Sequence, residues 1–183
     1  MAMPDTARRY TVDEVLAFPD DGNRYELVHG ELFVTPSPNQ PHQGALGELY
    51  YLLRTYLTPF KDYGRAFFAP ADIIWSNEDY VQPDLFVVPA KEVTGNWRDC
   101  QNLLLAVEVV SPSSARADRV KKRQLYQERG VATYWVVDVN ARLVEVWLPN
   151  DERPEIVTDT LRWRVTPGAP EISIDLPGLF ALV

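Results

Sequence analysis

The chain has 183 residues, a length that suits one domain with a sizeable hydrophobic core. Hydrophobic residues make up 46% and charged residues 24%, which excludes disorder, and the apolar runs are all too short to cross a membrane. The net charge of −8 argues against strong non-specific DNA binding, because such binding needs basic residues that neutralise phosphates. Cys100 is the sole cysteine and no signal peptide is evident, so we expect a cytoplasmic protein.

The amino-terminal part predicts a short helix followed by a hairpin. A capping-box pattern at Thr11–Glu14 starts the helix. Residues 24–34 then form the hairpin, which turns at a His-Gly pair and carries Glu26 on one arm and Glu31 just after the turn. Spacing alone favours the outer, solvent-facing side of the ribbon for both glutamates.

A long helix and a second hairpin are predicted next. After a proline-rich loop at residues 35–41, apolar residues follow helical spacing from His42 to Leu57. A lone histidine at a helix start is more often a cap or a surface residue than a ligand. Residues 66–75 and 81–88 then flank a polar turn and form the arms of the second hairpin.

Asp84 is the only charge in the apolar second arm of that hairpin. The preceding Pro83 has no N–H to give to a β-ladder, which places this part of the strand at a sheet edge or a strand start. Asp84 therefore either satisfies free backbone amides beside the proline or belongs to a functional site.

The strand expected at Leu103–Val110 carries a second isolated acid, Glu108, among aliphatic residues. A buried carboxylate is strongly penalised unless a cation, a metal or several hydrogen-bond donors meet it. A helix predicted over residues 115–129 follows, in which the spacing from Leu125 puts one or both of Lys121 and Lys122 beside the apolar stripe. If this helix folds back over the strand, the Lys122 ammonium reaches the height of Glu108.

Two isolated carboxylates in separate strands, with a lysine on the following helix, point to metal-assisted phosphodiester hydrolysis. Carboxylate, carbonyl and water oxygens are the ligands that Mg²⁺ prefers, and an incomplete protein shell leaves positions for phosphate and attacking water. A nearby ammonium can position or help to deprotonate that water and stabilise developing negative charge. The basic residues between Arg116 and Arg129 either present a positive surface to DNA or, more commonly, form a solvated helix face.

These residues also carry a family resemblance. Pro83-Asp84 and Glu108-Val-Val110 resemble the PD-(D/E)XK nuclease motif, except that Val110 stands where that motif has its lysine. A longer pattern is similar to the Uma family of restriction endonucleases, in which the next helix supplies this lysine. The pattern runs from Arg24 to Phe180 and consists of RYELVHGEL, PHQ, VQPDLFVV, VEVVSPSS, DRVKKRQLY, GVATYWVVDV and LPGLF.

The resemblance implies a role for each matched residue. Asp84 and Glu108 take the metal-ligand positions, the Val109 carbonyl is the backbone ligand, and Lys122 is the displaced lysine, with Lys121 as its rival. The cofactor implied is Mg²⁺, with Mn²⁺ as a possible substitute. Auxiliary residues implied by the same match are Glu31, His42 and Tyr126.

The implied fold is α/β (α+β), a restriction-endonuclease-like mixed β-sheet flanked by helices, with β-hairpin additions at both ends. We expect one nuclease-like domain over residues 1–183, in which residues 1–23 are a helix and lead-in and residues 24–183 form the core. By analogy with nucleases of this fold, we expect a homodimer that acts on DNA. Two alternatives stay open: a catalytically silent binding or assembly module with a buried Glu108–Lys122 pair, and a nuclease acting on RNA or branched DNA.

Overall fold

A six-stranded mixed sheet forms the centre of the computed structural model, which describes residues 8–35, 37–111 and 114–183. Its strand order is β10-β9-β8-β7-β6-β3. Only β7 and β8 run parallel, and the other neighbours are antiparallel. The bounds are β3 Gly64–Phe68, β6 Leu85–Pro89, β7 Leu105–Val109, β8 Tyr134–Asp138, β9 Leu143–Trp147 and β10 Glu155–Val157. The predicted mixed sheet is therefore confirmed.

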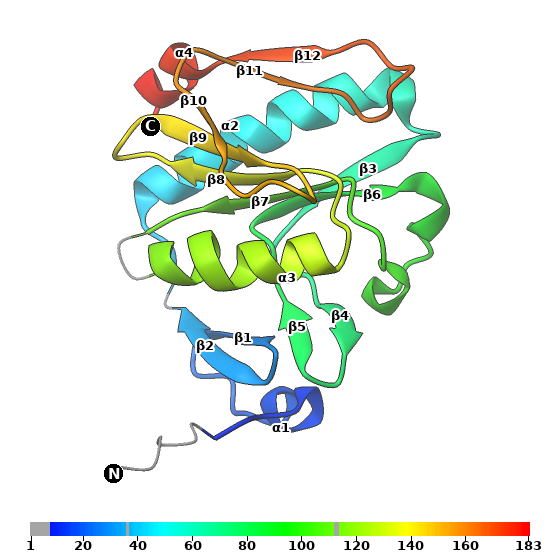
Figure 1. Ribbon diagram of the computed structural model, residues 1–183, viewed down its shortest axis with the longest axis vertical. Coiled ribbons are helices and arrows are strands. Elements are labelled where there is room, and N and C mark those ends of the chain that lie inside the picture. The colour runs from blue at the N-terminus through cyan, green and yellow to red at the C-terminus, as the bar shows by residue number, and fades with distance from the viewer. Residues whose placement is uncertain (1–7, 36, 112–113) are drawn as a thin grey trace.

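One face of this sheet is covered by the long helix α2, Gln40–Leu57 (Figure 1). Asn39 caps its first turn by accepting the backbone N–H of His42. The apolar side of α2, including Leu49 and Leu53, packs with Val107 in one buried cluster. This cluster supplies much of the hydrophobic stabilisation, since each fully buried leucine contributes about 2 kcal/mol.

The opposite face is covered by a π-helix, Ala117–Lys122, that continues into α3, Arg123–Glu128 (Figure 1). Leu125 of α3 packs with Ala106 of β7 in a second buried cluster. The strand β7 is thus covered on both faces, as predicted. Because side chains alternate along a strand, Glu108 shares the face of Ala106 and points toward the helix.

A second, four-stranded sheet lies beyond this helix, in the order β2-β1-β5-β4 (Figure 1). The predicted amino-terminal hairpin and the capping box before α1 are both confirmed. The strand β1 is an interior strand, because β2 pairs with one of its edges and β5 with the other. The bounds are α1 Val12–Leu16, β1 Arg24–Val28, β2 Glu31–Thr35, β4 Ile73–Ser76 and β5 Asp79–Val81.

The second hairpin was predicted as a single unit, and this prediction is wrong. Its tip, β4 and β5, belongs to the small sheet, whereas its base, β3 and β6, belongs to the central sheet. Pro70 and Pro83 interrupt the two arms at the level where they pass from one sheet to the other, and proline cannot continue a ladder. At this crossing the Ala69 N–H donates to the Asp84 carbonyl at 3.0 Å.

The carboxy-terminal hairpin, β11 Thr160–Trp163 and β12 Ile172–Asp175, leads into α4, Leu176–Ala181, and packs over α2 as the predicted addition. The segment between β6 and β7 contains the 3₁₀ turns η2 Ala90–Glu92 and η3 Trp97–Asp99, and a third, η1 Thr58–Phe60, follows α2. Residues 1–7 of the lead-in, Pro36 and residues 112–113 fall outside the described residues. Within the described part, no helix combines the length and apolarity needed to span a membrane.

Asp79 joins the small sheet to the end of α3. Its buried carboxylate accepts the His29 N–H at 2.9 Å and the Ser76 hydroxyl at 2.7 Å, and it pairs with Arg129. Burial alone would raise the pKa of Asp79, but the hydrogen bonds from His29, Ser76 and Arg129 together lower it. The ionised carboxylate is therefore the form that holds the two parts together.

Asp79→Ala should lower the free energy of unfolding at pH 7 by about 1–3 kcal/mol, because buried donors lose their acceptor. A lowered pKa stabilises the fold above the ordinary carboxyl pKa, so the difference from wild type should shrink as the pH falls below about 4. Urea denaturation at several pH values measures this. The exposed Asp62 is the control, and Asp62→Ala should change stability by less than about 0.5 kcal/mol. Equal effects of the two variants would contradict the role of Asp79.

Candidate active site

Asp84 lies immediately before β6. The strand β7 extends beyond the point where its pairing with β6 stops. The last antiparallel partners are Leu85 and Val107, so the edge of β7 beyond that point is open. The Asp84 carboxylate covers this edge by accepting the Val109 N–H at 2.9 Å. In an antiparallel ladder the N–H and C=O of one residue face the same neighbour, so the Val109 carbonyl also faces this open edge.

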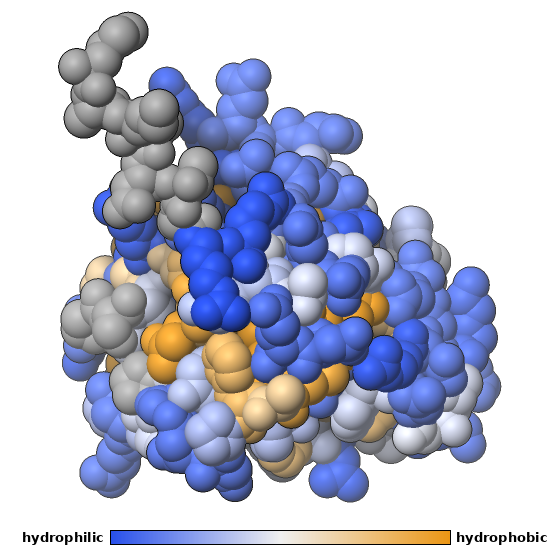
Figure 2. Space-filling view, turned by 90° about the horizontal axis from the view of Figure 1, so that it is seen from below, coloured by the Kyte–Doolittle hydropathy of each residue, from blue (hydrophilic) through white to orange (hydrophobic). Residues whose placement is uncertain are grey.

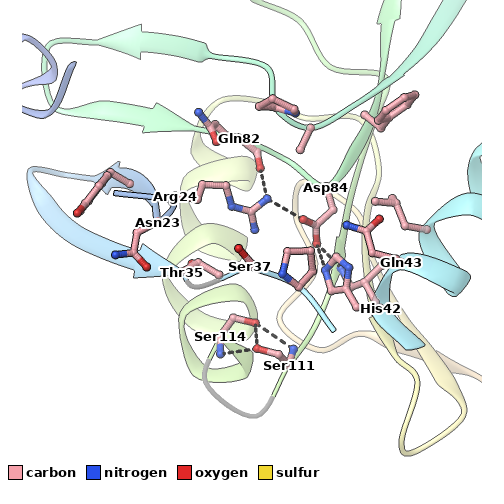
Figure 3. Close-up of a pocket in the computed structure, with 18 of the residues that line it drawn as sticks. Asn23, Arg24, Thr35, Ser37, His42, Gln43, Gln82, Asp84, Ser111 and Ser114 are labelled. Atoms are coloured by element: carbon pink, nitrogen blue, oxygen red, sulfur yellow. Dashed lines mark hydrogen bonds and ion pairs between the residues drawn. The ribbon is translucent and has the colours of Figure 1, made fainter. Parts of the chain in front are cut away.

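Two further donors meet the same carboxylate. Arg24 donates to Oδ1 of Asp84 at 2.8 Å, and Nε2 of His42 lies 3.1 Å from Oδ2 (Figure 3). Burial opposes ionisation of Asp84, but the His42 hydrogen bond and the Arg24 charge outweigh it and lower the pKa of Asp84. Asp84 is therefore a carboxylate at neutral pH. The His42 ring is buried and not on the surface, where spacing alone had favoured it.

Glu108 meets Lys122, and both side chains are almost fully buried. Nζ of Lys122 lies 3.1 Å from Oε1 of Glu108, 2.8 Å from Oε2 of Glu26 and 3.4 Å from Oδ1 of Asp118. Burial acts to lower the pKa of Lys122, but these three carboxylates raise it. Lys122 is therefore a fixed cation, and we call these four residues the Lys122 cluster.

Asp118 and Lys122 both lie in the π-helix and both are buried. The Arg123 N–H bonds to the carbonyl of Asp118, five residues back, where an α-helix would use a residue four back. This local widening of the helix is a departure from the α-helix predicted over residues 115–129. Single π turns are frequent at functional sites, because they redirect side chains from a regular helix.

Tyr126 completes the surroundings of Glu108. Its hydroxyl donates to Oε1 of Glu108 at 2.8 Å from a fully buried position. Burial and the nearby Glu108 charge raise the pKa of Tyr126, so the phenol stays neutral and keeps its proton for this bond. Burial and the neighbouring carboxylates also raise the pKa of Glu108, although Lys122 opposes this.

Two predicted auxiliary residues lie outside this arrangement. Lys121 and Glu31 are both exposed and pair with each other at 2.7 Å on the surface. The neighbouring lysines therefore point to different environments, and Lys122 is the one that meets Glu108. Other basic residues between Arg116 and Arg129 also contact neighbouring side chains. Arg119 pairs with Asp138 and Glu145, Arg129 pairs with Asp79, and Arg123 lies over Trp147.

Glu26, Asp118 and Arg24 are site residues that sequence reasoning missed. Glu26 is wholly buried, against the expected outer face, and its carboxylate meets the buried Lys122 of the π-helix. Its Oε1 accepts the Gln82 N–H at 2.8 Å. The four-residue spacing of Asp118 and Lys122 was a usable signal for Asp118. Arg24 and Glu26 both lie in the pattern RYELVHGEL, which was a usable signal for them, although their partners come from distant segments.

The site contains more carboxylates than cations. Four carboxylates, Glu26, Asp84, Glu108 and Asp118, face two fixed cations, Arg24 and Lys122. The raised pKa values of Glu108 and Asp118 reflect burial together with this surplus of negative charge. Oxygen donors of this kind suit Mg²⁺. In residues 8–35, 37–111 and 114–183, no three His, Cys, Asp or Glu side chains already form a ready-made metal cluster.

A cleft of about 1010 Å³ opens over the site. Arg24, His42, Asp84, Val109, Ser114 and Asp118 line its polar side. Figure 3 shows Arg24 and His42 converging on Asp84 from opposite sides, with Ser114 on a neighbouring wall. Asp84 is among the residues that line the cleft, whereas Glu108 and Lys122 are buried and are not among them.

The fold and the site together define a restriction-endonuclease-like protein: a mixed sheet between helices, with isolated acids on neighbouring central strands. A family model described as "Putative restriction endonuclease" matches residues 12–177, so the chain belongs to the Uma2 family, as the resemblance implied. The chain is also similar to a crystal structure of a "putative nuclease" from Anabaena variabilis ATCC 29413, with a TM-score of 0.79 and 20% identity over 94% of this chain and 98% of that chain. At that identity the likeness shows the fold. No curated protein matches the chain.

Lys122→Met should lower the free energy of unfolding by about 3–5 kcal/mol, because buried carboxylates lose their cation. Lys121→Met is a matched control on the adjacent residue, and it should cost less than about 1 kcal/mol, since its pair is exposed. Urea denaturation at neutral pH compares them. A Lys122→Met protein as stable as Lys121→Met would contradict the buried cluster.

Proposed function

We propose that this protein is a Mg²⁺-dependent endonuclease that hydrolyses phosphodiester bonds in DNA. The observation that carries the proposal is that Asp84, just before β6, and Glu108 of the adjacent strand β7 are both buried carboxylates, each paired with its own cation. A hydrophobic core does not retain isolated acids without such partners. Membership of a family described as restriction endonucleases supports the same reaction class.

Asp84, Glu108 and the Val109 carbonyl would hold the metal ion. When bound, Mg²⁺ supplies a Lewis acid that polarises the phosphate and lowers the pKa of bound water. The protein's own residues prepare this site. His42 orients Asp84 and keeps it ionised, and Tyr126 fixes one oxygen of Glu108. Lys122 keeps its proton, so its role is to hold Glu108 and stabilise negative charge, and not to remove a proton from water.

Arg24 would contact first Asp84 and then the substrate. It contacts Asp84 at the edge of the cleft, and part of its side chain is exposed. A guanidinium placed there can pass from the carboxylate to a substrate phosphate, because both accept the same paired N–H donors. The phosphate of the bound strand would then lie beside the carboxylates that hold the metal.

Wild-type protein with Mg²⁺ or Mn²⁺ should nick and linearise plasmid DNA, and EDTA should abolish the reaction. Asp84→Asn and Glu108→Gln should fall to the background without enzyme, because each removes a metal-holding charge. Glu31→Gln is the matched control, since Glu31 lies on the surface, and it should retain wild-type activity. Circular dichroism confirms that each variant is folded. Cleavage that persists in Asp84→Asn or Glu108→Gln would contradict the proposed site.

A second candidate is a catalytically silent binding or assembly module with the same fold. The observation that favours it is the saturation of Asp84, which already accepts bonds from Arg24, His42 and Val109. Titration calorimetry with Mn²⁺ separates the two candidates, because a nuclease site binds the ion and a silent module does not. A homodimer and a cytoplasmic location belong to the nuclease proposal by analogy and from the lone cysteine.

A further inference from the structure

We infer that the cleft takes an unpaired nucleotide, so that the preferred substrate is single-stranded DNA and not a duplex. The inference rests on the proposed function and deepens it by naming the substrate class. It comes from the side of the cleft that the metal chemistry does not use.

That side of the cleft is apolar. Leu16 and Phe18 line it from the α1 region, and Leu46 and Phe68 line it from α2 and β3. Leu16 is 45% exposed and Phe68 is 50% exposed, which is unusual for large apolar side chains beside buried acids. Seen from the end of the molecule that carries α1, hydrophobic side chains gather at the centre of a hydrophilic surface (Figure 2).

Phe68 is held close to the candidate active site. It is the last residue of β3, and the next residue donates its N–H to the carbonyl of Asp84 at 3.0 Å. The Tyr50 ring packs against it edge to face, with 4.8 Å between the ring centroids. A half-exposed aromatic ring that is fixed by a neighbour is a suitable platform for a nucleobase, because every base has a face that stacks.

The charges of the cleft disfavour a duplex. Of the described residues that line it, Arg24 is the only Lys or Arg, and it is already paired with Asp84. Asp20 and Asp118 line the same cleft. Duplex binding depends on several lysines or arginines that neutralise phosphates, and a chain with a net charge of −8 offers none here beyond Arg24.

A single strand needs less positive charge. Stacking of one base on an aromatic side chain contributes about 1–3 kcal/mol, independently of phosphate contacts. The volume of about 1010 Å³ is large for a small-molecule site and accommodates a nucleotide. One base against Phe68 and one phosphate near Arg24 would place the adjacent backbone at Asp84.

Fluorescence anisotropy in EDTA tests the inference without cleavage, using a labelled oligonucleotide as a single strand and as the matching duplex. The wild-type protein should bind the single strand at least about tenfold more tightly than the duplex. Phe68→Ala should weaken single-strand binding about 5- to 150-fold, the equivalent of one lost stack. Phe68→Leu, which keeps apolar volume without the aromatic face, should weaken it similarly. Tyr51→Ala, which removes an exposed aromatic residue outside the cleft lining, should have no effect.

The outcomes separate this inference from the proposed function. Equal affinity for single strand and duplex, or unchanged single-strand binding in both Phe68 variants, would overturn the inference even if the protein cleaves plasmid DNA. Selective single-strand binding that depends on Phe68, in a protein that cleaves nothing with Mg²⁺ or Mn²⁺, would support the inference and refute the nuclease proposal.

Discussion

The structure depends on one buried ammonium group surrounded by three carboxylates. Lys122 meets Glu26 from β1, Glu108 from β7 and Asp118 from its own π-helix. These contacts tie together the amino-terminal hairpin, the central sheet and the helix between them. Because unpaired buried charges are costly, the three elements are held in one relative position. That position puts the open edge of β7, Asp84 and the cleft on the same side of the molecule.

The cleft itself follows from the way two prolines divide a long hairpin between two sheets. The base of the hairpin stays in the central sheet, while its tip pairs with β1. Beyond the start of β6, β7 has no partner strand on that side, and the Asp84 carboxylate accepts the Val109 N–H there. The division of the hairpin between two sheets therefore leaves the edge of β7 free and places Asp84 beside it, next to the cleft. Asp79 then closes the far end of the small sheet against α3.

Asp84 and Glu108 could be singled out from the sequence because each is a charge in a locally apolar run, which the chain displays without knowledge of its partners. Lys122 was a candidate from helical spacing and the family resemblance, with Lys121 as its rival. The amino-terminal hairpin was predicted from its strand and turn pattern, whereas the mixed sheet and the carboxy-terminal hairpin addition were expected from the family resemblance. Spacing alone could not reveal the burial of Glu26, because that burial depends on the distant helix that brings Lys122 against the hairpin. The split hairpin and the π-helix were missed for a related reason: both depend on tertiary packing that overrides local spacing.

The proposed nuclease function requires that Asp84 and Glu108 hold a divalent ion. A crystal soaked in Mn²⁺ tests this most directly, since anomalous scattering locates the ion without reference to activity. The account predicts one strong peak within about 2.5 Å of oxygens from Asp84, Glu108 and the Val109 carbonyl, with Arg24 moved away from Asp84. Density that shows Arg24 still on Asp84 and no manganese peak between the two acids would contradict it.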